Sequence, residues 1–271
     1  ATADGYYSET GFTTEPRNFS GYPLNAGIYK MYANREMRFY ASVGFNGAVW
    51  QALSSSTNNN HTADYYYQGE DGRGGVTATS PNYPITGYVI KKFVNPMDAI
   101  NGTGARQIQK AYPIIRYAEI LLSYAEALNN LTGSHTVELD GKQYTLNRNK
   151  EEIRSAFNLV RYRAGLPGLR DEQLESSDEI QSQIERERMV EFLYENRRYY
   201  DVRRWGIYEE TEQEPIRGMN PDGATKETYF QRVIPSSSSF LTRVVDKRSV
   251  WVPIPRDEIR RLPSCAQNPG Y

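Results

Sequence analysis

The sequence is poor in the residues that most often carry metal and thiol chemistry. Its 271 residues include one cysteine, Cys265, and two histidines, His61 and His135. A single cysteine excludes an internal disulfide, and the three residues do not lie at metal-ligand spacing. No HExxH, CxxC or EF-hand pattern occurs. The sequence therefore predicts no metal site and no cofactor.

Charge of one sign and long apolar runs are also missing. The net charge is −1, from 32 basic and 33 acidic residues, so no strong field would draw the chain to nucleic acid or to an anionic membrane. The first residues, ATADGYYSETGF, lack the basic and apolar regions of a signal peptide. The most apolar stretch, 117–128, would span about 18 Å as a helix, short of the roughly 30 Å of a bilayer core.

The chain is rich in tyrosine, with 22 Tyr against 9 Phe and 3 Trp. Residues 1–105 are dominated by Gly, Asn, Ser, Thr and Tyr, with only short strand-like runs at 37–45 and 87–94. From residue 106 the apolar residues recur with the period of a helix. This change predicts an irregular lobe followed by a helical region.

The stretch 112–130, YPIIRYAEILLSYAEALNN, is the most strongly patterned helix. Its predicted apolar stripe consists of Tyr117, Ile120, Leu121, Tyr124, Ala125 and Leu128. A second stripe is polar and consists of Arg116, Glu119, Ser123 and Glu126. The pattern predicts a central packing helix buried between neighbours, whose polar line meets the charges of a partner or faces water.

Three further helices and one hairpin are predicted after this stretch. Asp140-Gly141 between two short runs indicates a hairpin over 136–146, because a type I′ turn needs two positive φ angles. Asn149 is a good N-cap for a helix that Gly165 ends. Its buried face is predicted to be Ile153, Ala156, Phe157, Val160 and Ala164. A third helix runs from Ser176 to about 195, and a shorter one covers 197–205.

These patterns predict a mainly α fold, in which a tetratricopeptide-like helical-repeat scaffold carries a loop-rich lobe and a few short strands. The predicted parts are a ligand-binding lobe over 1–105 and a scaffold over 106–210. An irregular segment, 211–271, is predicted to pack back on the scaffold.

Three glutamates, Glu187, Glu191 and Glu195, lie on one face of the third predicted helix. A glycoside hydrolase would use two carboxylates that flank a substrate, with a raised pKa on the acid. Carboxylates one turn apart share a helix face, and the arginines around them would lower their pKa values. The cluster is therefore better explained as an ion-pair network that joins this helix to the arginine-rich helix after it.

Aromatic residues on polar loops are the stronger functional signal, because sugar rings stack on Trp and Tyr while Asn and Asp bind hydroxyls. Rings that instead pack under the loops are the alternative. The predicted ligand-binding residues are Trp50, Asn58, Asp64, Tyr65, Tyr66, Tyr67 and Tyr83. No catalytic residue is predicted.

Several segments, in order along almost the whole chain, resemble the SusD/RagB family of outer-membrane nutrient-binding lipoproteins. They are NREMRFYASVGFNGAVW (34–50), TGYVIKKFVNP (86–96), YPIIRYAEILLSYAEALNN (112–130), FNLVRYRAGLP (157–167), IERERMVEFLYENRRYYDVRRWG (184–206), VWVPIPRDEI (250–259) and QNPGY (267–271). The likeness is to the C-terminal half of the family only, so the N-terminal half and its lipid anchor are expected to be missing from this chain.

The resemblance implies non-catalytic binding of an oligosaccharide or polysaccharide at the cell surface. It also implies a SusC-type TonB-dependent transporter as partner, and lipid anchoring of the full-length protein in the outer membrane. Two other functions stay open, a helical-repeat adaptor that binds a protein segment and a glycoside hydrolase that uses the glutamate cluster.

Overall fold

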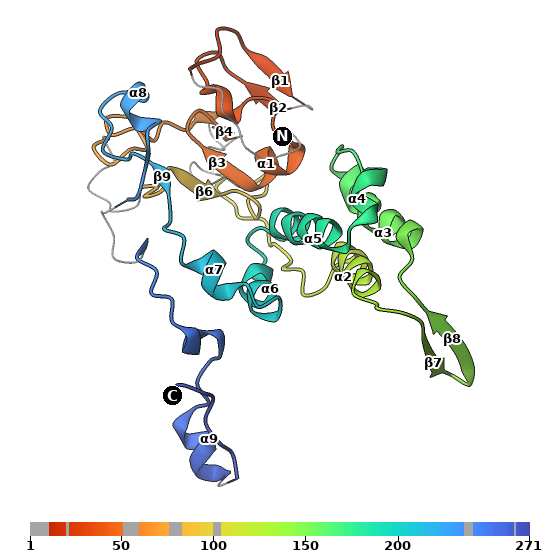
Figure 1. Ribbon diagram of the computed structural model, residues 1–271. Helices are drawn as coiled ribbons and strands as arrows, with labels where there is room; N and C mark the ends of the chain where they lie inside the picture. The colour runs from red at the N-terminus through yellow and green to blue at the C-terminus, as the bar shows by residue number, and fades with distance from the viewer. Residues whose placement is uncertain are drawn as a thin grey trace. The chain divides into compact units, whose positions relative to one another are not determined.

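A computed structural model describes residues 11–19, 22–50, 60–75, 83–99, 104–235, 241–262 and 264–271. The chain forms two compact units (Figure 1). The first comprises Ala1–Asp64 and Val89–Glu195, and the second comprises Tyr65–Tyr88 and Asn196–Tyr271. This division differs from the predicted one, because residues 1–105 contribute to both units and the predicted scaffold is divided at Glu195.

The first unit contains short strands and the longer helices. Its elements are β1 (Arg17–Phe19), β2 (Tyr22–Leu24), η1 (Lys30–Tyr32), α1 (Met37–Ser42), β3 (Val43–Phe45), β4 (Val49–Trp50), β5 (His61–Thr62), β6 (Tyr88–Ile90), α2 (Tyr117–Asn129), β7 (His135–Leu139), β8 (Lys142–Leu146), α3 (Lys150–Arg163), α4 (Asp171–Glu175) and α5 (Ser177–Glu191). The strands pair two by two, β1 with β2, β3 with β6, β4 with β5 and β7 with β8.

The second unit contains shorter elements. They are α6 (Arg197–Arg204), α7 (Tyr208–Glu212), β9 (Gly218–Met219), α8 (Lys226–Tyr229), β10 (Arg232–Val233), η3 (Lys247–Val250) and α9 (Arg256–Arg261). A mainly helical chain with a few short strands is what the sequence predicted. No helix in the described part of the chain has both the length and the apolarity that a membrane crossing requires.

Helix α2 is the centre of the core in the first unit. Tyr124 near its end bonds Glu152 at the start of α3, so α2 and α3 run antiparallel. Asn129 donates to the carbonyl of Ser177 at the start of α5, at 2.9 Å, so α5 also runs against α2. The core between these helices consists of Ala118, Leu122, Ala125, Leu128, Ile153, Ala156, Phe157, Val160, Leu169, Leu174, Ile180, Ile184 and Phe192.

Only part of the predicted stripe of α2 is buried. Tyr117, Ile120 and Tyr124 are 70%, 54% and 46% exposed, whereas Ala125 and Leu128 of the same stripe are buried, as is Leu122 outside it. Small alanines let neighbouring helices approach closely, while a tyrosine hydroxyl needs a polar partner or water. The helix is therefore covered on one side rather than on both.

The polar line of α2 meets charged partners, one of the two predicted outcomes. Arg116, just before the helix, bonds the carboxylates of Glu191 at the end of α5 and of Glu195 beyond it. Arg188 of α5 donates to Ser123, at 3.3 Å. Glu126 is 5% exposed.

The other local predictions are largely confirmed. Asn149 caps α3 by accepting hydrogen bonds from the amides of Glu151 and Glu152, and the predicted apolar face of this helix is buried. Asp140 and Gly141 both have positive φ in the β7–β8 hairpin, which extends away from the helices (Figure 1). The strand-like run 37–45 is a strand only over Val43–Phe45, since Met37–Ser42 forms α1. Helix α5 ends at Glu191, four residues before the predicted end.

Candidate functional site

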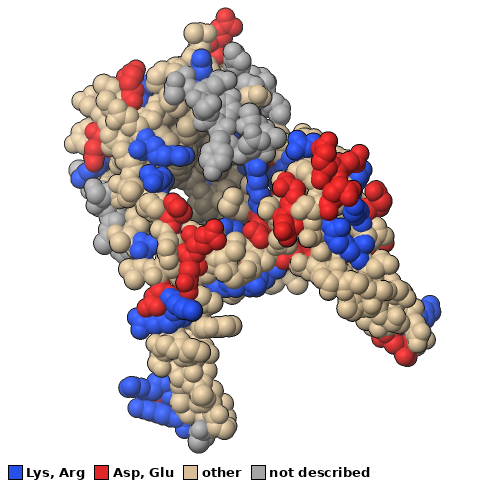
Figure 2. Space-filling view, viewed as in Figure 1, with Lys and Arg blue, Asp and Glu red and all other residues tan. Residues whose placement is uncertain are grey.

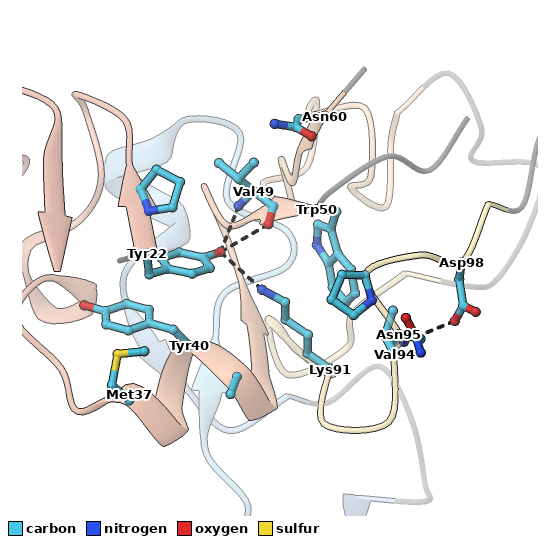
Figure 3. Close-up of a pocket in the computed structure, with 13 residues that line it drawn as sticks. Tyr22, Met37, Tyr40, Val49, Trp50, Asn60, Lys91, Val94, Asn95 and Asp98 are labelled. Carbon is cyan, nitrogen blue, oxygen red and sulfur yellow. Dashed lines mark hydrogen bonds between the residues drawn. The ribbon is translucent and has the colours of Figure 1, made fainter. Parts of the chain in front are cut away.

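A pocket of about 380 Å³ lies in the first unit, between β2, α1, β4 and the segment that follows β6 (Figure 3). Its volume is within the range of small-molecule sites. The lining residues are Tyr22, Pro23, Met37, Tyr40, Ala41, Val49, Trp50, Asn60, Lys91, Val94, Asn95, Pro96 and Asp98. Aromatic rings and a few polar groups thus share one concave surface.

Tyr22 is held in place by the backbone of β4. Its hydroxyl donates to the carbonyl of Val49, at 3.2 Å, and accepts from the amide of the same residue, at 3.1 Å. Its ring stacks on Tyr40, with centroids 4.7 Å apart and planes 10° apart. Burial raises the pKa of the Tyr22 phenol. The ring therefore has a fixed orientation in the pocket wall.

Trp50 is half-buried and is the predicted residue that reaches the pocket. Its indole packs over Gly44 of β3, where an added Cβ would lie 2.7 Å from the ring. Gly44 thus allows the close approach that fixes the indole. Such a rigid ring, partly open to solvent, can stack on the apolar face of a sugar.

Lys91 is the cation of the pocket. Its ammonium lies 3.4 Å from the Tyr22 hydroxyl and 4.6 Å from the centroid of that ring. It lies 5.6 Å from the Trp50 ring. Burial lowers the pKa of this lysine.

Asp98 is the carboxylate among the described lining residues, and its oxygens are engaged. It accepts from Lys110 and from the amides of Ile108, at 2.7 Å, and Asn95, at 3.2 Å. The bonds from Lys110 and Ile108 hold the pKa of Asp98 below its usual value. The described lining therefore does not offer the two carboxylates that a glycosidase places on either side of its substrate.

The structure divides the predicted ligand-binding residues between the two units. Trp50 and Asp64 belong to the first unit, whereas the predicted tyrosines belong to the second. Asp64 is half-buried and does not line the pocket. Asn58 lies outside the described residues, although its neighbour Asn60 lines the pocket.

The four tyrosines differ in exposure. Tyr65 is 6% exposed and packs in the interior, so it presents no ring face to a ligand. Tyr66 and Tyr83 are half-buried, and Tyr67 is 39% exposed. Tyr83 and Tyr66 lie near cations of the second unit, since Arg73 stands 5.8 Å from the Tyr83 ring and Lys226 stands 6.0 Å from the Tyr66 ring.

The loop that carries Tyr65, Tyr66 and Tyr67 is tied to the segment before α8. The amide of Tyr67 donates to the carbonyl of Gly223, at 3.0 Å, and Arg73 pairs with Asp222, at 2.5 Å. A Cβ on Gly72 would lie 1.8 Å from the carbonyl oxygen of Tyr66. The loop therefore requires glycine there in order to fold back on itself.

Sequence reasoning missed Tyr22 and Lys91. Tyr22 stands in a short Gly- and Asn-containing segment, and only the bonds of its hydroxyl to the backbone of Val49 in β4 hold it beside Trp50. Lys91 directly follows the apolar run YVI of β6. The pattern alone could not say which way the side chain points.

Glu187 and Glu191 of α5 and Glu195 beyond its end form an ion-pair network, as predicted, but with other partners. Glu187 binds Arg38 and Arg161, at 2.6 and 3.0 Å. Glu191 binds Arg38, Arg116 and Arg163. Glu195 binds Arg116 and Lys92. Within the described residues, the partners come from α1, α3 and the segments before α2, rather than from the helix at 197–204.

This network is buried and opposes catalysis. The glutamates are 3%, 3% and 5% exposed. Burial disfavours the ionised form of Glu191, but bonds from Arg116 and Arg38 outweigh it and lower its pKa. The pKa of Glu195 is lowered by Arg116 and Lys92 against the same burial. A general acid needs the opposite shift. Figure 2 shows that charges of both signs also mix over the outer surface of these helices.

The comparisons with known proteins agree with this architecture. The SusD family model matches residues 1–271, and the chain belongs to the SusD family. It is 27% identical over 171 residues to SusD-like protein P2 of Formosa agariphila. These 171 residues are 63% of this chain and 28% of that protein.

Two solved structures share the fold. A SusD-like protein from Bacteroides fragilis has a TM-score of 0.65 at 29% identity, over 89% of this chain and 40% of that one. A protein named BT4246 has a TM-score of 0.70 at 23% identity, over 95% of this chain and 40% of that one. The chain thus spans about 40% of the length of the solved relatives it matches.

Proposed function

We propose that this chain binds an oligosaccharide or polysaccharide, without catalysis, as the surface subunit of a nutrient uptake system. The pocket that joins Trp50 and Tyr22 carries the proposal, because fixed aromatic rings beside Asn60 and Lys91 suit the two faces of a sugar. Membership of the SusD family supports it. The lowered pKa values in the glutamate network argue against a hydrolase.

The wider setting is part of the same proposal. The ligand is delivered to a SusC-type TonB-dependent transporter, and the full-length protein is anchored by lipid in the outer membrane. The antiparallel packing of α2 with α3 and α5 supports a tetratricopeptide-like scaffold. Tyr66, Tyr67 and Tyr83 form a second proposed contact surface, in the second unit.

Affinity electrophoresis across a panel of neutral and acidic polysaccharides tests the binding. We expect at least one glycan to retard the protein, and Trp50→Ala to weaken that retardation about tenfold or more, which is 1.4 kcal/mol. Trp251→Ala is the matched control, because Trp251 is 57% exposed and lies outside the pocket. Trp50→Phe, with a thermal melt, separates lost stacking from lost folding. An unretarded wild-type protein would overturn the proposal.

A protein-binding adaptor is the second candidate. The exposed row of Tyr117, Ile120 and Tyr124 on α2 favours it, since large apolar side chains in a row often mark an interaction surface. A pull-down with the SusC-type transporter tests it, comparing wild type with Ile120→Arg. Recovery of the transporter together with no binding of any glycan would favour the adaptor.

A further inference from the structure

Lys91 directly follows β6, and its side chain lines the pocket. Its ammonium stands close to the Tyr22 hydroxyl and within cation–π distance of two rings, at 4.6 and 5.6 Å (Figure 3). A charge partly buried among rings loses hydration, and rings replace only part of that loss. The lowered pKa of Lys91 reflects this burial. The position therefore favours a ligand that brings a negative charge.

No carboxylate in the described part of the chain pairs with Lys91. Asp98 lines the same pocket, but it is occupied by Lys110 and two backbone amides. The undescribed segments next to the pocket in sequence, 51–59 and 100–103, contain no acidic residue. Of all acidic residues, only Asp4 and Glu9 lie outside the described ranges.

The neighbouring lysine shows what a structural cation looks like in this fold. Lys92 binds the carboxylate of Glu195 and donates to the carbonyls of Glu191 and Leu193, both at 3.0 Å. Its three donors are therefore satisfied within the protein. Among the described residues, the Lys91 ammonium has one polar contact, the Tyr22 hydroxyl at 3.4 Å, which leaves donor capacity directed at the pocket.

We propose that the pocket takes an acidic saccharide, whose carboxylate or sulfate binds the Lys91 ammonium while the sugar ring lies against Trp50. This rests on the proposed function and specifies its ligand class. An ammonium paired with an anion in a partly desolvated site contributes more than a neutral hydrogen bond. The charge of Lys91 would then make the pocket prefer acidic over neutral glycans, whereas stacking on Trp50 would contribute to the binding of both classes.

The test measures binding of the full chain to four polymers. Polygalacturonate supplies carboxylates and a sulfated galactan supplies sulfates, while amylopectin and galactomannan are neutral. Lys91→Gln removes the charge and Lys91→Arg keeps it. Lys142→Gln is the charge-matched control, because Lys142 is exposed on the β7–β8 hairpin and does not line the pocket.

We expect the wild-type protein to bind at least one acidic polymer more tightly than both neutral ones. Lys91→Gln should weaken that binding about tenfold or more, whereas Lys91→Arg and Lys142→Gln should stay within about threefold of wild type. Raising the salt concentration should weaken binding of the acidic polymer but not binding of the neutral polymers. The polymer that binds identifies carboxylate or sulfate as the anion.

Two results would overturn the inference and leave the proposed function standing. One is binding of neutral polymers only, and the other is equal weakening by Lys91→Gln and Lys142→Gln. Failure to bind any of a broad glycan panel overturns the proposed function, and this inference with it. Because thermal melts of all variants are compared first, loss of folding is not mistaken for loss of the ligand.

Discussion

The buried glutamate network makes the strongest prediction about stability. Glu191 is 3% exposed and accepts from Arg38, Arg116 and Arg163. Glu191→Gln keeps the shape of the side chain but removes its charge, which leaves three arginines without that counter-charge. Removing one partner of a buried ion pair costs about 3–5 kcal/mol.

That loss is large for a protein of this size. Domains are typically stable by about 5–15 kcal/mol, and 1 kcal/mol shifts the melting temperature by about 2–4 °C at 150–250 residues. We therefore expect Glu191→Gln to lower Tm by about 6–20 °C in differential scanning fluorimetry. Glu175→Gln is the control, because the Glu175 side chain is 73% exposed and its ion-pair partner among the described residues is the exposed Lys150. Exposed pairs contribute about 0–1 kcal/mol.

The same network fixes the pH dependence. The pKa values of Glu191 and Glu195 are lower in the folded protein than in the unfolded chain. Their ionised forms therefore stabilise the fold fully above the unfolded-state pKa of about 4.3, and this stabilisation is lost as the pH falls through the folded-state pKa. The wild-type protein should therefore lose stability below about pH 4. Below that pH, the difference in melting temperature between the wild-type protein and Glu191→Gln should become smaller. A neutral-pH melt of Glu191→Gln within 2 °C of wild type would refute the reasoning.

Two further predictions concern the helices. Leu122→Ala should lower the free energy of unfolding by about 2–5 kcal/mol, because Leu122 is fully buried. Ile120→Ala should change it by under about 1 kcal/mol, because Ile120 is 54% exposed. Equal losses for the two variants in urea unfolding would instead support the buried stripe predicted from the sequence. Asn149→Ala should cost about 1 kcal/mol, because it removes the side-chain acceptor for the amides of Glu151 and Glu152. Asn149→Asp, which keeps an acceptor, should stay near wild type in the same assay.

The sequence by itself determined the features that depend on neighbouring residues. The cap at Asn149 and the turn at Asp140-Gly141 follow from local hydrogen bonds and φ preferences, and both occur where predicted. The buried face of α3 follows from its apolar period. The segments that resemble the SusD/RagB family, taken together in their order along the chain, were specific enough to indicate the family, which the family match confirms.

Only the tertiary structure decided which side chains meet. Tyrosine counts as apolar in a periodic pattern, yet Tyr117 faces solvent while Ala118 and Ala125 of α2 are buried. Arg38 reaches the glutamates of α5 from 149 residues away, and no local pattern encodes such a pair. Tyr22, Trp50 and Lys91 likewise come from β2, from β4 and from the residue after β6, which belong to three separate two-stranded sheets, and only the packing of these segments brings them into one pocket. Chain spacing carries no information about these contacts, because they form only when distant segments fold against one another.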